Sequence, residues 1–229
     1  MLFGIEVESE FYDKYLFFYI DRFVYTSIEV ENDNNKDIIN NKKKNLLNAF
    51  KYVLKIKTHP LTIWEIQNIG LLINENEDIS GTFRKINVSA GAKAIFTPVS
   101  YKEIINRLYY LLDCYKNIWC SLDVFEREAM FHIQFMRIHP FEDGNKRTAK
   151  TILNRNLIYQ NKAPVIIEDE ETDLYYKFIN EEDYIGFAEF IRNKSENELT
   201  TMVGLYKMLN KIPINAEIDI LAKKKEKEM

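Results

Sequence analysis

The chain has few of the residues that break helices and build turns. Its 229 residues include seven glycines and five prolines, too few for an all-β fold with many tight turns. Hydrophobic residues make up 46% of the sequence and aromatic residues 14%, which is enough for a substantial core. We therefore expect an all-α fold, as one large helical domain or one domain with appended segments.

The sequence also lacks a net positive charge, cysteines at metal-site spacing and a long apolar run, and each absence argues against a class of protein. The net charge of −4 argues against nucleic-acid binding, which needs a basic surface. The two cysteines, Cys114 and Cys120, have no zinc-site or CxxC spacing, so we expect reduced thiols. The apolar run at 15–20 is too short to span a bilayer, and residues 1–6 lack the basic start of a signal peptide. These features favour a cytoplasmic protein with no nucleic-acid or membrane partner.

Helical patterns occupy most of the chain. Residues 10–31 are apolar almost all round, so other elements must bury that helix. Residues 33–45 are rich in Asn and Lys and are expected to form a polar connector with a solvated face. The patterns predict about eight helices, at 10–31, 46 to about 59, 62–73, 100–115, 121–138, 145–160, 172–193 and 195–211.

Two of these helices begin with a capping-box pattern. Thr62 is followed by Glu65, and Ser100 by Glu103, three positions later in each case. In such a box the hydroxyl of the first residue and the carboxylate of the second bind each other's backbone N–H groups. Both helices are therefore expected to start at these residues.

One stretch differs from the helical pattern. Residues 81–98 contain β-branched and aromatic residues around a central Gly91, and this is the one good candidate for a β-hairpin. A single hairpin must lean on helices and keeps an open edge. The predicted organisation is thus an N-terminal helix and connector at 1–45, a core domain at 46–193, and a C-terminal helix with a charged tail at 194–229.

The polar loop at 139–150 carries the chemistry. Pro140 biases His139 away from α conformation and ends the preceding helix. Gly144 permits a tight turn, and a new helix is expected to begin at about Asn145. The first N–H groups of that helix would point into the loop and form an anion site.

Side chains of the same loop complete a candidate phosphate site. Arg147 and Lys150 are three residues apart, so both lie on one helix face. Asp143 stands where a Mg²⁺ ion that bridges phosphate oxygens needs a carboxylate. His139 suits the removal of a proton from an attacking hydroxyl, and Phe141 is expected to turn into the core. Each residue alone has an ordinary structural explanation, but their combination within twelve residues favours an active site.

The loop resembles the signature of the Fic family, HxFx(D/E)GN(G/K)Rxx(R). The resemblance covers about residues 45–193, and it includes the entry to the hairpin at 81–84 and the pair Tyr175-Tyr176. The matching signature residues are His139, Phe141, Asp143, Gly144, Asn145, Lys146 and Arg147.

The resemblance implies an all-α Fic fold with a β-hairpin flap, and transfer of a nucleotide moiety from ATP to a hydroxyl side chain of a target protein. His139 would be the base for a Ser, Thr or Tyr hydroxyl, and Asp143 would hold Mg²⁺. Gly144, Asn145 and Lys146 would furnish the anion hole and Arg147 a phosphate clamp. The flap, about residues 85–94 with Lys85, Ile86, Asn87 and Val88 at its start, would dock the target by strand addition.

Two positions depart from the commonest signature. Lys150 replaces the last arginine and loses its bidentate fork. Lys146 is shared with Doc toxins, which resemble Fic proteins and phosphorylate their target, although Doc-like motifs carry Ala where this chain has Gly144. Protein adenylylation is therefore the favoured function. The alternatives are a Doc-like protein kinase and a catalytically silent peptide-binding module.

The end of the first predicted helix also resembles a family motif. Ser27, Glu31 and Asn32 fit the inhibitory pattern (S/T)xxxE(G/N). The resemblance implies that Glu31 pairs with Lys150 or Arg147 and blocks productive placement of the γ-phosphate. The apolar first helix could also serve a homodimer, and the enzyme could modify itself.

Overall fold

The computed structural model describes residues 9–28, 36–56, 58–75 and 81–210. Within these residues the fold is all-α, as predicted, and no strand is formed. A π-helical turn at Cys114–Ile118 follows α4. The eight α-helices are α1 (Ser9–Ile28), α2 (Lys36–Lys55), α3 (Ile63–Ile73), α4 (Ile104–Asp113), α5 (Val124–Ile138), α6 (Asn145–Tyr159), α7 (Thr172–Glu181) and α8 (Tyr184–Asn210).

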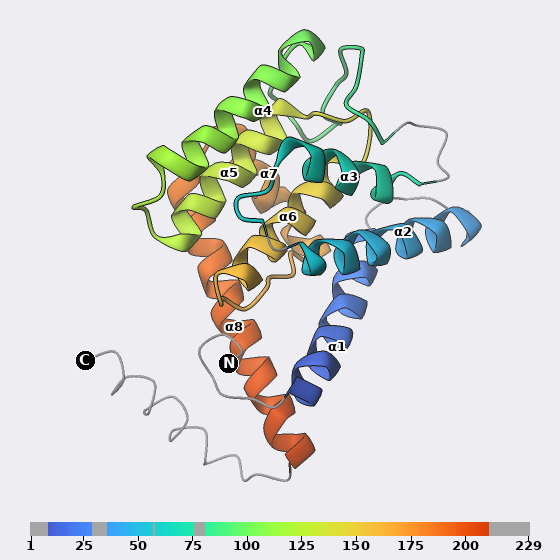
Figure 1. Cartoon of the computed structure of the whole chain (residues 1–229), viewed down its shortest axis with the longest axis vertical. Helices are drawn as coiled ribbons and strands as arrows, with labels where there is room; N and C mark the ends of the chain where they lie inside the picture. The colour runs from blue at the N-terminus through green and yellow to red at the C-terminus, as the bar shows by residue number, and fades with distance from the viewer. Residues whose placement is uncertain (1–8, 29–35, 57, 76–80, 211–229) are drawn as a thin grey trace.

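Helices α5 and α6 form the centre of the fold (Figure 1). Helix α6 packs against α2, α3 and α5, and α5 also packs against α4, α7 and α8. Twelve of the fifteen residues of α6 are buried, including polar ones, because neighbours surround it. Helix α1 lies against α2 and α8. None of the described helices is long and apolar enough to cross a membrane.

Helix α1 is held to the rest of the fold by buried polar contacts as well as by its apolar surface. The Tyr15 hydroxyl donates to Glu198 of α8 at 3.0 Å, and Arg22 donates to both oxygens of that carboxylate at 3.1 Å. The Tyr19 hydroxyl donates to the carbonyl of Val165 at 2.9 Å. The helix predicted to need burial is therefore fixed on two sides.

Two predicted helix boundaries are wrong. The connector at 33–45 is helical from Lys36. Its exposed Lys and Asn side chains lie on the solvent side of an amphipathic helix, whereas Asn45 is buried and donates to the carbonyl of Glu75 at 2.6 Å. The last two helices divide at Glu182, not near residue 194. Glu182 adopts the left-handed conformation with φ 53°, and the Asp183 carboxylate accepts from the N–H of Gly186 at 2.8 Å at the start of α8.

Of the two predicted capping boxes, one is confirmed. Thr62 and Glu65 make both reciprocal hydrogen bonds at the start of α3. Ser100 makes no side-chain capping bond. Its carbonyl instead accepts from the N–H of Glu103 at 2.9 Å, so a 3₁₀ turn precedes α4 and displaces the predicted box.

The predicted β-hairpin at 81–98 is not formed among the described residues, and this segment is a loop. It rises above the helices between α3 and α4 (Figure 1). Its return leg bonds to α7 instead of to a second strand: the Asn180 side chain accepts from the N–H of Ile95 at 3.0 Å and donates to the carbonyl of Lys93 at 3.0 Å. These contacts take the backbone groups that a hairpin would have paired.

A buried polar network ties α6 to the segment before α3. Arg155 is 2% exposed and donates to the carbonyls of Ile56 and Thr58 and to Nδ1 of His59. Burial and, to a smaller extent, the charge of nearby Arg155 lower the pKa of His59 to about 4. The ring is therefore neutral, and its Nε2–H donates to the Tyr115 hydroxyl at 3.1 Å, which donates in turn to the buried carboxylate of Glu128.

Replacing Arg155 with Met should strongly destabilise the fold. The change leaves two backbone carbonyls without their guanidinium donor, at a cost of about 3 kcal/mol. We expect the melting temperature to fall by about 6–12 °C in a chain of this size, measured by differential scanning calorimetry. Arg107→Met is the matched control, because Arg107 is 56% exposed and its carboxylate partner is 3.7 Å away. An equal loss in both variants would contradict the assigned role of Arg155.

Candidate active site

The loop after α5 has the break that Pro140 predicts. His139 adopts the left-handed conformation with φ 52°, and its N–H donates to the carbonyl of Phe135 at 3.0 Å. Helix α5 therefore ends at Ile138, and the chain turns at once into the polar loop.

Phe141 anchors the loop in the core, as predicted. Its side chain is fully buried and its ring centroid lies 5.4 Å from that of Phe83. The ring passes so close to Gly70 of α3 that a Cβ atom there would lie 2.2 Å from Phe141 Cε1. The Asn145 side chain accepts from the N–H of Phe141 and donates to its carbonyl, at 2.9 and 2.8 Å. The side chain of Asn145 thus shapes the loop.

Gly144 makes the turn into α6. Its φ of 77° lies in the left-handed region, where residues with a side chain are strained. A Cβ atom there would also lie 2.8 Å from Asn74 Oδ1 and 2.9 Å from Ile73 Cγ2. Asn74 donates to the carbonyl of Asp143 at 3.2 Å. Helix α6 begins at Asn145, as predicted, and its first N–H groups have the geometry of an anion site.

Arg84 joins the segment at 81–98 to this loop. Its side chain is 3% exposed, and Nε donates to the carbonyl of His139 at 2.8 Å. The two terminal nitrogens donate to the carbonyls of Ile86, Val99 and Ile138, and the Arg84 N–H donates to the carbonyl of Pro140 at 2.9 Å. The Arg84 guanidinium therefore fixes both ends of this segment against the loop that carries His139.

A pocket of about 260 Å³ lies at the junction of these parts. His139 and residues 142–147 line it on one side, Ser89, Ala90 and Gly91 on another, and Tyr176 of α7 on a third. Tyr175, the neighbour of Tyr176, is buried, and its hydroxyl lies 2.8 Å from Nε2 of His132. This contact holds the start of α7 so that the half-buried ring of Tyr176 faces the pocket.

His139 has the protonation state of a base. Its Nδ1 lies 3.3 Å from the carbonyl of Met136, which can only accept, so Nδ1 carries the proton. The unprotonated nitrogen is then Nε2. Burial lowers the pKa of His139 to about 4, while the bond to Met136 and the charge of Asp143 partly oppose this shift. The ring is thus neutral at pH 7.

The charged residues of the signature separate into two groups. Arg147 is 1% exposed and pairs with Asp143 at 2.9 Å, and both line the pocket with Lys146. Lys150 does not line it. Its Nζ donates to the carbonyl of Ile167 at 3.2 Å and lies 5.8 Å from the centroid of the Tyr175 ring. Burial and, to a smaller extent, the charge of Lys146 lower the pKa of Lys150 to about 7.

The remaining predicted site residues lie in two places. The side chains of Lys85, Ile86 and Asn87 are exposed and Val88 is half-buried. They precede the three residues that line the pocket. Ser27 is buried in the last turn of α1, whereas Glu31 lies outside the described residues.

Sequence patterns alone did not identify three positions that build the site. Arg84 lies in the segment at 81–84 that the family resemblance includes, but no local pattern indicates its role, and none marks Asn74 or Asn180. Asparagines at helix ends and in helix interiors are common, so their bonds to a distant loop are visible only in three dimensions. No group of three or more potential metal-binding side chains occurs among residues 9–28, 36–56, 58–75 and 81–210.

Asp143 nevertheless fits a magnesium ion bound together with phosphates. Its carboxylate is 45% exposed and faces the pocket. Mg²⁺ is commonly held by one or two carboxylates, with phosphate oxygens and water as the other ligands. A single carboxylate beside an anion site is therefore a suitable donor set.

Comparison with known proteins agrees with this geometry. Residues 60–157 match the family model described as the Fic/DOC family. The chain is 28% identical over 171 residues to protein adenylyltransferase fic-1 of Caenorhabditis briggsae, covering 72% of this chain and 33% of the relative. It is 31% identical over 122 residues to protein adenylyltransferase Fic of Drosophila grimshawi, covering 52% and 25%. The matches thus span about a quarter to a third of these relatives.

Solved structures share the fold. A Fic domain containing signaling protein from Bacteroides thetaiotaomicron superposes with a TM-score of 0.75 at 19% identity, covering 86% of this chain and 90% of that one. Fic-1 from C. elegans superposes with a TM-score of 0.74 at 21% identity, covering 90% and 69%. Residues 60–157, which include the loop at 139–147, thus match the Fic/DOC family model, and the solved structures show the same fold over most of the chain.

Proposed function

We propose that the protein is an adenylyltransferase that transfers AMP from ATP to a Ser, Thr or Tyr hydroxyl of a target protein. The observation that carries this proposal is the neutral His139, whose Nε2 is unprotonated beside the N-terminus of α6. The name of the matched relatives, protein adenylyltransferase, supports the same reaction.

In this reaction His139 takes the proton of the target hydroxyl on Nε2. The hydroxyl oxygen attacks the α-phosphorus of ATP, a P–O bond to the target forms, and the bond to pyrophosphate breaks. The imidazolium can later return its proton to solvent. A neutral histidine is required at the start, because only the unprotonated nitrogen can accept.

The first turn of α6 would bind the phosphates. The N–H groups of Gly144, Asn145 and Lys146 would form the anion hole, and the Arg147 side chain would clamp a phosphate. Asp143 would hold Mg²⁺, which neutralises phosphate charge when bound. Tyr176 offers an aromatic face at the pocket wall, and such a face suits the stacking of a nucleotide base.

The flap at 85–94 would dock the target. The side chains at its start, Lys85 to Asn87, are exposed. A target strand would pair there with backbone groups other than the Ile86 carbonyl, which accepts from Arg84. Asn180 fixes the return leg, so the flap is held in place before a target arrives. A preordered docking segment loses less conformational entropy on binding.

The first prediction from this function concerns the transferred group. Wild-type protein incubated with ATP and Mg²⁺ and a lysate should yield targets heavier by one AMP, measured by intact mass and peptide mass spectrometry. His139→Ala should lower transfer by at least about a hundredfold, and Asp143→Asn should lower it through loss of the metal. Tyr109→Ala is the control, since that side chain is exposed and lies outside the pocket. Addition of phosphate alone would instead indicate the Doc-like kinase.

A second prediction concerns the pKa of His139. In an NMR titration without ATP, its imidazole should titrate near pH 4 rather than 6.5, and His139→Asn assigns the resonance. Since the folded-state pKa lies below the unfolded value, the unfolded state binds more protons below pH 6.5. This histidine therefore lowers the free energy of unfolding as pH falls from 6.5 towards 4. Titration at or above 6.5 would contradict the buried, neutral base.

A third prediction concerns inhibition by the motif at Ser27 and Glu31. Glu31→Gly should raise AMP transfer severalfold, because the carboxylate would no longer compete for the cations of α6. Glu29→Gly is the control for changing a nearby glutamate. Equal transfer by wild type, Glu31→Gly and Glu29→Gly would rule out the inhibitory role while leaving the transferase itself intact.

A further inference from the structure

A second and larger cavity lies on the opposite face of α5. Its volume is about 490 Å³, against 260 Å³ for the His139 pocket. In the last turns of α5, Met136 lines the His139 pocket, whereas Gln134, Arg137 and Ile138 line the larger cavity. At about 100° per residue these two sets lie on opposite sides of the helix. We call the larger cavity the α4–α5 groove.

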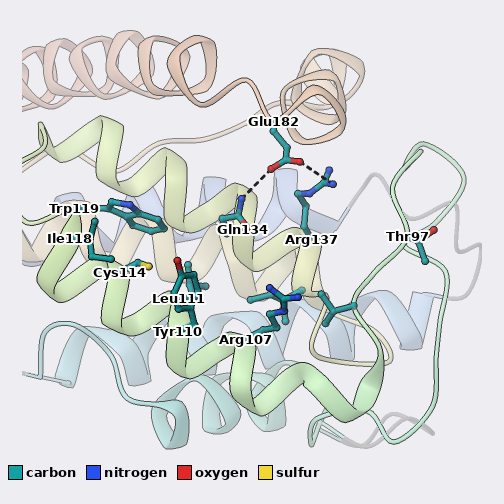
Figure 2. A pocket seen from close by; sticks show the side chains of 12 residues that line it. Thr97, Arg107, Tyr110, Leu111, Cys114, Ile118, Trp119, Gln134, Arg137 and Glu182 are labelled. Atoms are coloured by element: carbon teal, nitrogen blue, oxygen red, sulfur yellow. Dashed lines mark hydrogen bonds and ion pairs between the residues drawn. The ribbon is translucent and has the colours of Figure 1, made fainter.

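One end of the groove is polar, and its charges are already paired. Figure 2 shows Glu182 between Gln134 and Arg137, with a dashed line to each. Arg137 lies 3.1 Å from Glu182 and 5.1 Å above the ring of Phe96. This end therefore offers little to an incoming charge.

The rest of the groove is apolar and aromatic. Leu111, Cys114 and Ile138 are buried in its wall. Tyr110 and Ile118 also line it but remain 63% and 58% exposed, and Trp119 lies beside Ile118 in Figure 2. A bulky apolar side chain could cover these surfaces and gain the free energy of their burial.

Arg107 adds a positive charge beside the apolar part of the groove. It lines the groove, its side chain is 56% exposed, and its carboxylate partner Glu103 is 3.7 Å away and 54% exposed. Such a surface pair contributes little stability, so Arg107 can exchange it for another carboxylate. The groove lining holds two arginines and one glutamate, in a chain of net charge −4.

The groove is continuous with the flap that would carry the target. Thr97 and Val99, at the return from the flap, form one of its walls, and Figure 2 shows Thr97 on that loop. Arg84 holds the carbonyls of Val99, Ile138 and His139 together. A polypeptide on the flap therefore has the catalytic pocket on one side of this junction and the groove on the other.

We propose that the α4–α5 groove is a docking site for the protein substrate, which inserts a bulky apolar side chain flanked by a carboxylate that pairs with Arg107. This proposal rests on the proposed function for the identity of the occupant. It adds a recognition element separate from the backbone pairing of the flap, and it selects targets with an acidic and aromatic segment near the modified hydroxyl.

Direct binding tests the groove without any transfer. The probe is a short Gly/Ser peptide with Asp-Phe-Asp at its centre, compared with peptides that carry Lys-Phe-Lys or Asp-Ala-Asp. Trp119 fluorescence reports binding in a Trp64→Phe background, since Trp64 lies on α3 and is 73% exposed. We expect the Asp-Phe-Asp peptide to bind at least about tenfold more tightly than either comparison peptide.

Matched variants identify the residues responsible. Arg107→Glu should weaken binding of the Asp-Phe-Asp peptide by about tenfold or more and favour the Lys-Phe-Lys peptide. Tyr110→Asp should weaken it as well. Lys116→Glu and Tyr109→Asp are the controls, because both residues are exposed near the groove but do not line it. Absence of binding, equal binding of all three peptides, or no effect of Arg107→Glu would overturn the proposal.

Transfer assays separate this proposal from the proposed function. His139→Ala should abolish AMP transfer and leave peptide binding unchanged. For acceptor peptides that contain the acidic aromatic segment, Arg107→Glu should raise KM severalfold with little change in kcat. If AMP is transferred but Arg107→Glu has no effect on KM, the groove proposal fails and the transferase stands. If the peptides bind with the expected selectivity but no AMP is transferred, the proposed transferase function fails and the groove remains a peptide-binding site.

Discussion

The bonds of Arg84 to backbone carbonyls are the constraint on which the site depends. A buried guanidinium must satisfy its donors, and here they meet the carbonyls of Ile86, Val99, Ile138 and His139. These carbonyls come from the end of α5 and from both legs of a segment that lacks strand pairing. The flap and the catalytic candidate therefore keep a fixed relation although no sheet joins them. Loss of the Arg84 side chain would free the flap and the His139 loop from each other.

The loop at 139–145 shows how packing determines chemistry. Burial of Phe141 and the two bonds of Asn145 fix the backbone, and the left-handed His139 then directs its Nδ1 towards Met136. That bond selects the tautomer, and burial keeps the ring neutral. Packing also determines the role of Lys150. Its burial against Ile167 and Tyr175 removes it from the pocket, so its charge belongs to the core between α6 and α7.

Much of the fold could be predicted because its helices are long and periodic. The burial of α1, the Thr62 capping box, the break at His139 and the start of α6 at Asn145 all follow from local residue chemistry. The wrong predictions have tertiary causes. In the segment at 81–98, backbone groups that a hairpin would pair with each other bond instead to the side chains of Asn180 and Arg84. No local sequence pattern reveals these distant partners. The break between α7 and α8 depends on the unusual left-handed conformation of Glu182. The first turns of α2, from Lys36, are so rich in polar residues that their sequence resembles that of a linker.

Gly70 has a consequence for how related sequences are interpreted. The position lies far from the signature in the chain, yet any side chain there would meet the ring of Phe141. A related protein could keep every letter of the signature and still displace its loop through one substitution in α3. Recognition of an active member by its motif alone is therefore incomplete. A reliable diagnosis would also inspect the positions equivalent to Gly70, Asn74 and Arg84, which support the motif from outside it.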